Sequence, residues 1–168
     1  ELAGIEVSAG RVRIGALTRH RELEDSADIA AHAPLIAQAI RQVAHPAIRN
    51  RGTIGGSIAF ADPAAELPAC VLALNGEIEI ARPDGRRKVA AGDFFKGLYD
   101  TDLGSGEIIT AVEFAADSDD WCTGFDELAR RHGDYAMAGL AARLRIDGET
   151  VAEARLAYFA VGDKPVLG

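Results

Sequence analysis

The chain has 168 residues, of which 48% are hydrophobic and 26% are charged, and its formal net charge is −8. This length fits one domain or two small ones, and the composition is that of a soluble globular protein. The acidic charge argues against binding to nucleic acid or to an acidic membrane surface. No apolar run reaches the roughly 20 residues of a membrane helix. No signal peptide is expected either, because the chain opens on a glutamate rather than on a basic segment.

The cysteines and histidines indicate neither a disulfide framework nor a metal site. Cys70 and Cys122 form no CxxC pair, and Cys70 lies in an apolar run, where it is predicted to be a small core residue. The four histidines lack the spacing of metal ligands. We therefore expect a cytoplasmic, reducing location and no metal bound by this chain.

The first part of the chain predicts a hairpin and then helices. Apolar and charged residues alternate over 5–7 and 11–14, on either side of the turn Ser8-Ala9-Gly10, which predicts a β-hairpin with one buried face. Thr18 is expected to cap a short helix over residues 19–24.

Two further helices are expected between these elements and the middle of the chain. Residues 34–44 place their apolar side chains on one helical face, and His45-Pro46 ends that helix because the residue before proline avoids helical dihedrals. His45 is interpreted as a structural boundary residue rather than a catalytic base. Residues 68–74 form an apolar helix that Asn75-Gly76 closes.

Strands dominate the remainder. A second hairpin is predicted over 77–81 and 86–90, Asp93 is expected to cap a short helix, and residues 107–114 form a strand. The small acidic segment 115–120 is the expected domain boundary.

Beyond this boundary, the sequence predicts strands at 123–130, 137–146 and 151–161. The middle one carries leucines on one face and Arg143 and Arg145 on the other. The fold class is therefore α+β with mostly antiparallel pairing. A doubly wound nucleotide fold is disfavoured because no GxGxxG joins a strand to a helix.

The most informative stretch is Thr53-Ile54-Gly55-Gly56-Ser57. Glycines adopt positive φ without steric cost, and successive N–H groups in such a turn can form a concave nest for an anion. The hydroxyls of Thr53 and Ser57 would add donors to the same oxygens. A phosphate or diphosphate is the expected ligand, and a tight structural turn is the alternative.

The sequence around these glycines resembles a known family. Residues 49–57, followed by Ala-Asp-Pro-Ala-Ala-Glu-Leu-Pro at 61–68, resemble the FAD-binding medium subunit of molybdenum hydroxylases, of the carbon monoxide dehydrogenase type within the xanthine dehydrogenase family. Four more segments match that family in its order, at residues 14–18, 93–95, 106–109 and 130–136.

This resemblance implies a partial FAD-binding domain of the PCMH type, which is VAO-like, over residues 1–116. Residues 119–168 would begin a small antiparallel C-terminal domain. The chain is expected to be a fragment that lacks both ends of the subunit, including a first glycine-rich flavin loop upstream.

The resemblance also implies the cofactor-binding residues. Thr53, Ile54, Gly55, Gly56 and Ser57 would bind the FAD diphosphate. Glu66 would contact sugar or ribityl hydroxyls, Leu103 would be an apolar flavin contact, and Tyr135 would lie close to the isoalloxazine.

Each of these assignments has a structural alternative. Glu66 is also consistent with a solvated helix start, Leu103 with a core residue, and Tyr135 with an ordinary strand start. Arg130 and Arg131 fit either a solvated strand end or a surface toward a partner or the cofactor. At Asp126 some xanthine dehydrogenases carry a flavin-contacting lysine, and its absence here weakens the case for NAD⁺ as acceptor.

The family context places the substrate chemistry on other chains. Substrate would be oxidised at a molybdopterin centre on a large subunit. Electrons would then pass through [2Fe-2S] clusters on a small iron-sulfur subunit to FAD on this chain and on to an external acceptor. Quinone, NAD and oxygen remain open as acceptors, with peripheral association to a membrane or quinone as one option. No catalytic residue is expected on this chain.

Two other functions remain as alternatives. Gly-Gly-Ser57-Ile-Ala is one residue short of a GxSxG nucleophile elbow, which suggests a serine hydrolase. However, its lead-in is a polar loop rather than a buried strand, and no histidine is visibly placed to activate the serine. The other alternative is a flavin-free interaction module.

Overall fold

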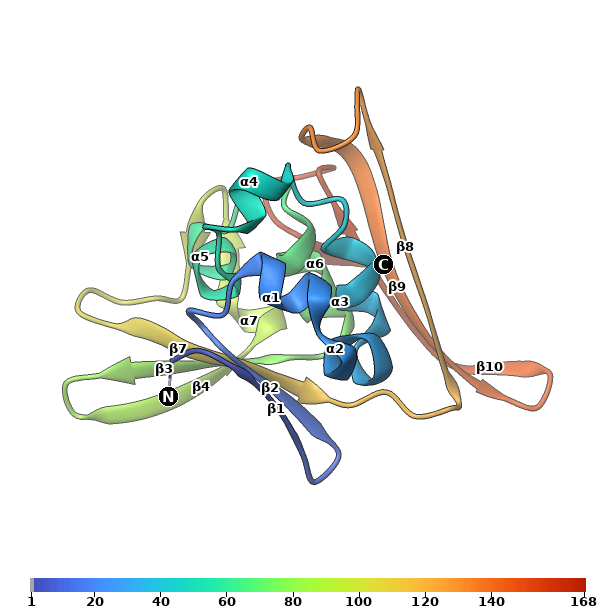
Figure 1. Cartoon of the computed structure of the whole chain (residues 1–168), viewed down its shortest axis with the longest axis horizontal. Helices are drawn as coiled ribbons and strands as arrows, with labels where there is room; N and C mark the ends of the chain where they lie inside the picture. Colours follow the sequence, from blue (N-terminus) through green and yellow to red (C-terminus); the bar gives the residue numbers. More distant parts are fainter. Residues whose placement is uncertain (1) are drawn as a thin grey trace.

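The computed structural model describes residues 2–168 and consists of a layer of short helices between two antiparallel sheets (Figure 1). The α+β class with antiparallel pairing, predicted from the sequence, is confirmed. Within residues 2–168, no helix combines the length and the hydropathy that crossing a membrane requires.

The larger sheet has five strands in the order β1-β2-β7-β3-β4. Their bounds are β1 Ile5–Ser8, β2 Arg11–Gly15, β3 Glu77–Arg82, β4 Gly85–Ala90 and β7 Ile108–Ala115. Both predicted hairpins are confirmed, as β1 with β2 and β3 with β4. Strand β7 joins them by pairing with β2 and β3, so that Val12, Ile78 and Val112 contribute to one core.

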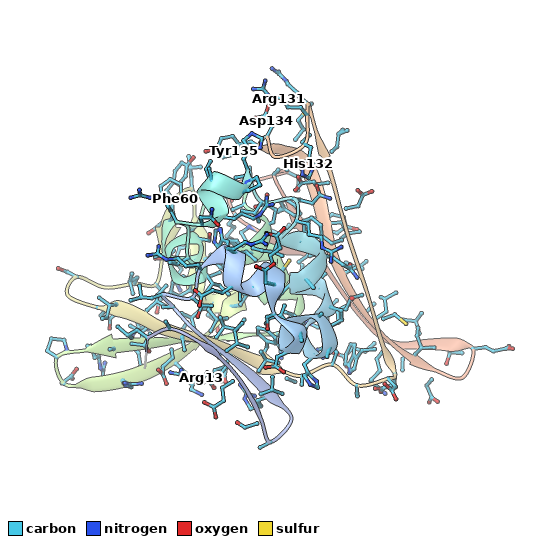
Figure 2. All side chains as sticks on the ribbon, viewed as in Figure 1. Arg13, Phe60, Arg131, His132, Asp134 and Tyr135 are labelled. Atoms are coloured by element: carbon cyan, nitrogen blue, oxygen red, sulfur yellow. The ribbon has the colours of Figure 1, made fainter. Side chains whose placement is uncertain are left out.

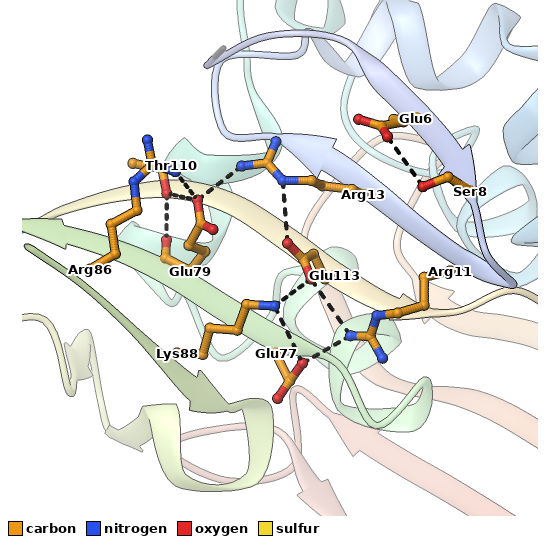
Figure 3. Close-up of polar contacts among 10 residues, drawn as sticks. All are labelled: Glu6, Ser8, Arg11, Arg13, Glu77, Glu79, Arg86, Lys88, Thr110 and Glu113. Carbon is orange, nitrogen blue, oxygen red and sulfur yellow. Dashed lines mark hydrogen bonds and ion pairs between the residues drawn. The ribbon is translucent and has the colours of Figure 1, made fainter.

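The two faces of this sheet differ in character. Arg13 lies on the face turned away from the helices, whereas Phe60 and Tyr135 lie on the opposite side of the molecule (Figure 2). Around Arg13, oppositely charged side chains alternate across the strands (Figure 3). Arg13 contacts Glu79 at 2.9 Å and Glu113 at 3.2 Å, and Lys88 contacts Glu113 at 2.6 Å. Each of these carboxylates forms an ion pair with a cationic side chain of the same sheet face. The charges on this face therefore largely neutralise one another.

Within residues 2–168, seven helices lie between the sheets (Figure 1). They are α1 His20–Asp25, α2 Ala27–His32, α3 Pro34–Ala39, α4 Pro46–Arg49, α5 Ile54–Phe60, α6 Glu66–Ala73 and α7 Ala91–Phe94. Helix α5 packs on β7 and β2 of the larger sheet, while α3 and α6 pack on the smaller one. Every residue of α6 is buried, because the helix packs on β9 and β10 and is covered by α3, α5 and α7.

Three predicted helix boundaries are wrong. Helix α1 begins after Arg19, because the Thr18 hydroxyl does not cap it but instead exchanges hydrogen bonds with the main chain of Gly4. Helix α3 ends at Ala39, although the predicted apolar face is buried as far as Val43. Helix α7 has Ala90 at its N-cap, and Asp93 lies inside its first turn.

The smaller sheet has the order β11-β10-β9-β8. Its strands are β8 Trp121–Ala129, β9 Ala136–Asp147, β10 Thr150–Phe159 and β11 Val166–Leu167, and a separate two-stranded sheet is formed by β5 Phe95–Gly97 and β6 Asp100–Thr101. The three strands predicted in this part are confirmed. On β9 the arginine-bearing face is turned inward, since Arg143 is only 4% exposed and lies 3.7 Å above the ring of Trp121.

Candidate functional site

The glycine stretch begins helix α5 and does not form an open nest. Thr53 is the N-cap, and its Oγ1 accepts a hydrogen bond from the Gly56 amide at 3.1 Å. The Ile54 and Gly55 amides donate to the carbonyls of Thr18 and Ala16, and the Ser57 amide donates to the Thr53 carbonyl. All four amides are therefore committed within the protein. These amides therefore form no free nest, because a threonine N-cap directs the segment into a helix, and the binding of a diphosphate by this segment stays a prediction.

Neither glycine is needed for a positive φ, since neither is among the residues with left-handed dihedrals. A Cβ on Gly55 would lie 2.5 Å from the Ala16 Cβ and 2.7 Å from the Ala16 carbonyl oxygen. A Cβ on Gly56 would meet only the Thr53 Oγ1, at 3.0 Å. Gly55 thus allows α5 to approach the segment after β2, whereas Gly56 faces open space.

That open space is a cavity of about 530 Å³, which we call the arginine pocket. It is lined by Leu17, Arg19, Arg51, Gly52, Thr53, Gly56, Ser57 and Phe60. The Arg19 guanidinium donates to the main-chain carbonyl of Arg51, which draws the two arginine segments together. Arg19, Arg51, Thr53 and Ser57 are among the residues that line this pocket, and side chains of these types can bind an anion.

A second cavity of about 350 Å³, the tyrosine pocket, adjoins the first. It is lined by His20, Val43, Ala44, Ile48, Ser57, Phe60, Asp62, Ala64, Ala65, Glu66, Gly133, Asp134 and Tyr135. Ser57 and Phe60 line both pockets, so the two cavities meet along one side of helix α5. The fold therefore brings Ser57, Glu66 and Tyr135 to one place from α5, α6 and the β8–β9 turn.

Aromatic side chains stand at the rim of the tyrosine pocket. Tyr135 is 71% exposed and Phe60 is 60% exposed, and the Phe60 ring lies 5.0 Å from that of Tyr99. Phe60 and Tyr135 lie toward the same upper part of the molecule, near α4 and the β8–β9 turn (Figure 2). Exposed aromatic rings at a cavity mouth are suited to contact a planar ligand.

Glu66 is the buried acid of the tyrosine pocket. It opens helix α6 and is only 9% exposed, so the alternative of a solvated carboxylate does not hold. Burial raises the pKa of Glu66 to about 7, and the negative charges of Glu127 and Asp62 add to the shift. Near neutral pH this group is therefore present both as the ionised carboxylate, which only accepts hydrogen bonds, and as the protonated carboxylic acid, which can also donate one.

The raised pKa of Glu66 predicts a pH-dependent stability. In the unfolded chain, Glu66 loses its proton near its ordinary pKa of 4.5, whereas the folded protein retains the proton up to about pH 7. The folded state binds more protons in that window, so the free energy of unfolding should fall as the pH rises from 5 to 8. Glu66→Gln should therefore stabilise the full-length protein at pH 8 by roughly 2 kcal/mol more than at pH 5.

Urea unfolding of the variant and the wild-type protein at both pH values measures this difference. The exposed acid Asp28 offers a control, and Asp28→Asn should change stability equally at the two pH values. Equal effects of Glu66→Gln at pH 5 and pH 8 would contradict the assignment.

Ser57 has a histidine neighbour that the sequence analysis missed. The Ser57 Oγ lies 3.0 Å from His20 Nε2, so the prediction that no histidine is placed near this serine is wrong. Burial lowers the pKa of His20, the main chain of Thr53 opposes this shift, and the Arg49 charge adds to it. His20 is the first residue of α1, and nothing in the sequence spacing relates it to the glycine stretch.

This serine–histidine contact does not complete a hydrolase triad. Ser57 lies within helix α5 rather than on a strand-to-helix elbow, and the His20 Nδ1 has no hydrogen-bond partner among residues 2–168. A triad requires an acid that orients this second nitrogen. The geometry therefore does not support the serine hydrolase.

The other predicted site residues lie in different surroundings. Ile54 is buried in the core, and Leu103 is packed against the core outside the lining of both pockets. Asp126 is exposed on β8, and Arg131 pairs with Asp134 at 3.2 Å. Sequence reasoning missed Arg19, Arg51, Phe60 and Asp62. The basic lead-in to the glycines was the available signal for Arg51, whereas the others reach the site only through the fold.

Comparison with known proteins matches both parts of the chain. Residues 1–115 match the FAD binding domain in molybdopterin dehydrogenase, and residues 123–168 match the CO dehydrogenase flavoprotein C-terminal domain. The chain is 39% identical over 165 residues to the glyceraldehyde dehydrogenase medium chain of Sulfolobus acidocaldarius, covering 98% of this chain and 58% of that protein. It is 38% identical to the carbon monoxide dehydrogenase medium chain of Hydrogenophaga pseudoflava, covering 94% and 55%.

Solved structures agree with this relationship. Carbon monoxide dehydrogenase from Hydrogenophaga pseudoflava superimposes with a TM-score of 0.97 at 37% identity, over 99% of this chain and 58% of that one. Quinoline 2-oxidoreductase from Pseudomonas putida 86 gives a TM-score of 0.92 at 40% identity, over 99% and 57%. The chain thus spans somewhat more than half the length of the relatives it matches, and these relatives are subunits of oxidoreductases. By its sequence and its fold, the chain belongs to the family of FAD-binding domains of molybdopterin dehydrogenases.

Proposed function

We propose that this chain is part of the flavoprotein subunit of a molybdenum hydroxylase-type oxidoreductase, and that it binds FAD where the arginine and tyrosine pockets meet. The observation that carries the proposal is the junction of the two cavities at Ser57 and Phe60. One cavity has cationic walls and the other is lined by a buried acid and aromatic rings, in a chain whose family binds FAD.

The residues present fit the parts of this cofactor. A diphosphate is matched by the guanidiniums of Arg19 and Arg51 and by the hydroxyls of Thr53 and Ser57. Sugar or ribityl hydroxyls are matched by the Glu66 carboxyl, which can both accept and donate hydrogen bonds near neutral pH.

The remaining predicted contacts take different roles in this proposal. Tyr135 supplies an exposed aromatic surface for the flavin ring. Ile54 and Gly55 act through packing, because both are buried behind the pocket. Leu103 as a flavin contact rests on the family resemblance alone.

FAD, when bound, supplies the redox chemistry, and the protein's own residues bind and orient it. We propose that electrons reach the FAD on this chain from [2Fe-2S] clusters on a small subunit, after substrate oxidation at a molybdenum centre on a large subunit. The relatives' names, which include medium chains and subunits, support such a three-part assembly. We also propose a cytoplasmic location and a domain boundary within residues 116–119.

The proposal is tested by the full-length subunit and one substitution in the arginine pocket. The wild-type protein should bind FAD with the absorbance of a bound flavin. Arg51→Gln should raise the Kd for FAD about 10- to 100-fold, which corresponds to the loss of one charge-assisted contact. Titration of the apoprotein with FAD, followed by flavin fluorescence, measures both values.

Arg41 provides a matched control, since it is an exposed arginine that lines neither pocket. Arg41→Gln should leave the Kd within about two-fold of the wild-type value. A full-length wild-type subunit that stays colourless after incubation with FAD would overturn the proposed function. If the two substitutions changed the Kd for FAD equally, the proposal that the diphosphate binds in the arginine pocket would be rejected.

A further inference from the structure

The imidazole of His20 contacts Ser57, the serine that lines both pockets. His20 is 4% exposed, and its Nε2 lies 3.0 Å from the Ser57 Oγ. A Cβ on Gly52 would lie 2.8 Å from the His20 Nδ1 and 2.9 Å from its Cε1, so glycine at this position makes room for the ring. The ring is thus held between Gly52 and Ser57.

The surroundings of the ring select one tautomer. The His20 Nδ1 is buried and has no hydrogen-bond partner among the described residues. With the proton on Nδ1, the protein would bury an unpaired N–H donor, which folded proteins tolerate less readily than an unpaired acceptor. Burial also disfavours the doubly protonated cation, and it lowers the pKa of His20 accordingly. The neutral ring that carries its proton on Nε2 is therefore preferred.

This tautomer fixes the direction of the hydrogen bond to Ser57. In this tautomer the Nε2–H would donate to the serine oxygen, which lies 3.0 Å away. The hydroxyl proton of Ser57 is then not used by His20, and the described residues provide no other partner for it. Because Ser57 lines both pockets, this proton is available to a ligand there.

We propose that His20 is a positioning residue that holds Ser57 as a hydrogen-bond donor toward an anionic oxygen of the bound cofactor. The inference rests on the proposed FAD site and adds a role for a buried side chain that lines the tyrosine pocket beside Ser57. The hydrogen bond between His20 and Ser57 runs in the opposite direction to that of a catalytic serine–histidine pair, in which the histidine accepts the serine proton.

A double-mutant cycle on the full-length subunit tests this role. Ser57→Ala and His20→Met should each raise the Kd for FAD about three- to ten-fold, the range expected for one neutral hydrogen bond. If His20 acts on the cofactor through Ser57, as proposed, the double variant should be no weaker than the weaker single variant. His20→Gln, whose amide can still donate, should recover most of the affinity lost in His20→Met.

A spectroscopic measurement keeps the test independent of whether His20→Met folds. Nitrogen-15 NMR of the imidazole in the wild-type subunit should show the proton on Nε2. A proton on Nδ1 would overturn the inference, as would additive losses in the cycle or a His20→Gln variant as weak as His20→Met. If the wild-type protein binds FAD but the cycle is additive, only this inference fails. If the wild-type protein binds no FAD, the proposed function fails and this role fails with it.

Discussion

The Gly55→Val substitution is expected to destabilise the subunit strongly, whereas Gly56→Ala is expected to leave it stable with weaker FAD binding. At position 55, a Cβ would lie 2.5 Å from the Ala16 Cβ and 2.7 Å from the Ala16 carbonyl oxygen. This oxygen also accepts a hydrogen bond from the Gly55 amide. Neither contact can be relieved by a side-chain rotation, because the backbone itself is in the way. Separating α5 from this segment should cost at least about 3 kcal/mol, a large share of the stability of a typical domain.

Gly56 is the matched control within the same helix. Its added methyl group would meet only the Thr53 hydroxyl at 3.0 Å, and alanine favours a helix over glycine by about 1 kcal/mol. The methyl group would project into the arginine pocket and should weaken FAD binding about ten-fold or more, the cost of one displaced polar contact. Circular dichroism with urea unfolding measures stability, and flavin fluorescence measures affinity. A soluble Gly55→Val protein of wild-type stability would contradict this account of the glycine pair.

The second large effect is expected at the buried ion pair that joins the linker to the smaller sheet. The Arg143 Nη2 lies 2.7 Å from the Asp117 Oδ1, and both side chains are 5% exposed. Arg143 also lies 3.7 Å above the Trp121 ring. Asp117→Asn would leave a buried guanidinium without its counter-charge, and we expect a loss of about 3 kcal/mol in the free energy of unfolding.

The neighbouring Asp119 provides the control, because it is an exposed acid in the same segment. Asp119→Asn should change stability by less than about 0.5 kcal/mol. Urea unfolding of the full-length protein measures both. A loss of similar size for the two substitutions would show that the effect comes from net charge rather than from the buried pair. An Asp117→Asn protein as stable as the wild type would contradict the assignment outright.

The two arginines at positions 49 and 51 show why the site could be predicted only in part. Both belong to the same basic lead-in to the glycines. The Arg49 side chain turns inward, where its Nε lies 2.9 Å from Glu24 and its Nη1 donates to the Val43 carbonyl at 3.0 Å. Arg51 lines the arginine pocket. Arg49 is the last residue of α4, whereas Arg51 lies in the turn that follows this helix, so the two side chains have different surroundings.

Local sequence patterns determined the secondary structure and the class of the fold. Alternating apolar residues predicted both hairpins of the larger sheet and the long strands of the smaller one, because strand periodicity is a property of neighbouring residues. The family resemblance, carried by contiguous motifs, placed Ser57, Glu66 and Tyr135 in one site, and the fold brings these three side chains to the tyrosine pocket.

The tertiary structure alone decided which groups face the site and in what chemical state. The amides of Ile54 and Gly55 donate to the carbonyls of Thr18 and Ala16, which lie far away in the sequence. These amides are therefore not free to bind an anion, and we assign that role to Arg19 and Arg51 in the arginine pocket. The pKa of Glu66 rises to about 7 because the smaller sheet and the neighbouring helices bury α6, and because Glu127 and Asp62 lie nearby. Such long-range contacts depend on how the elements pack, and no local spacing of residues encodes them.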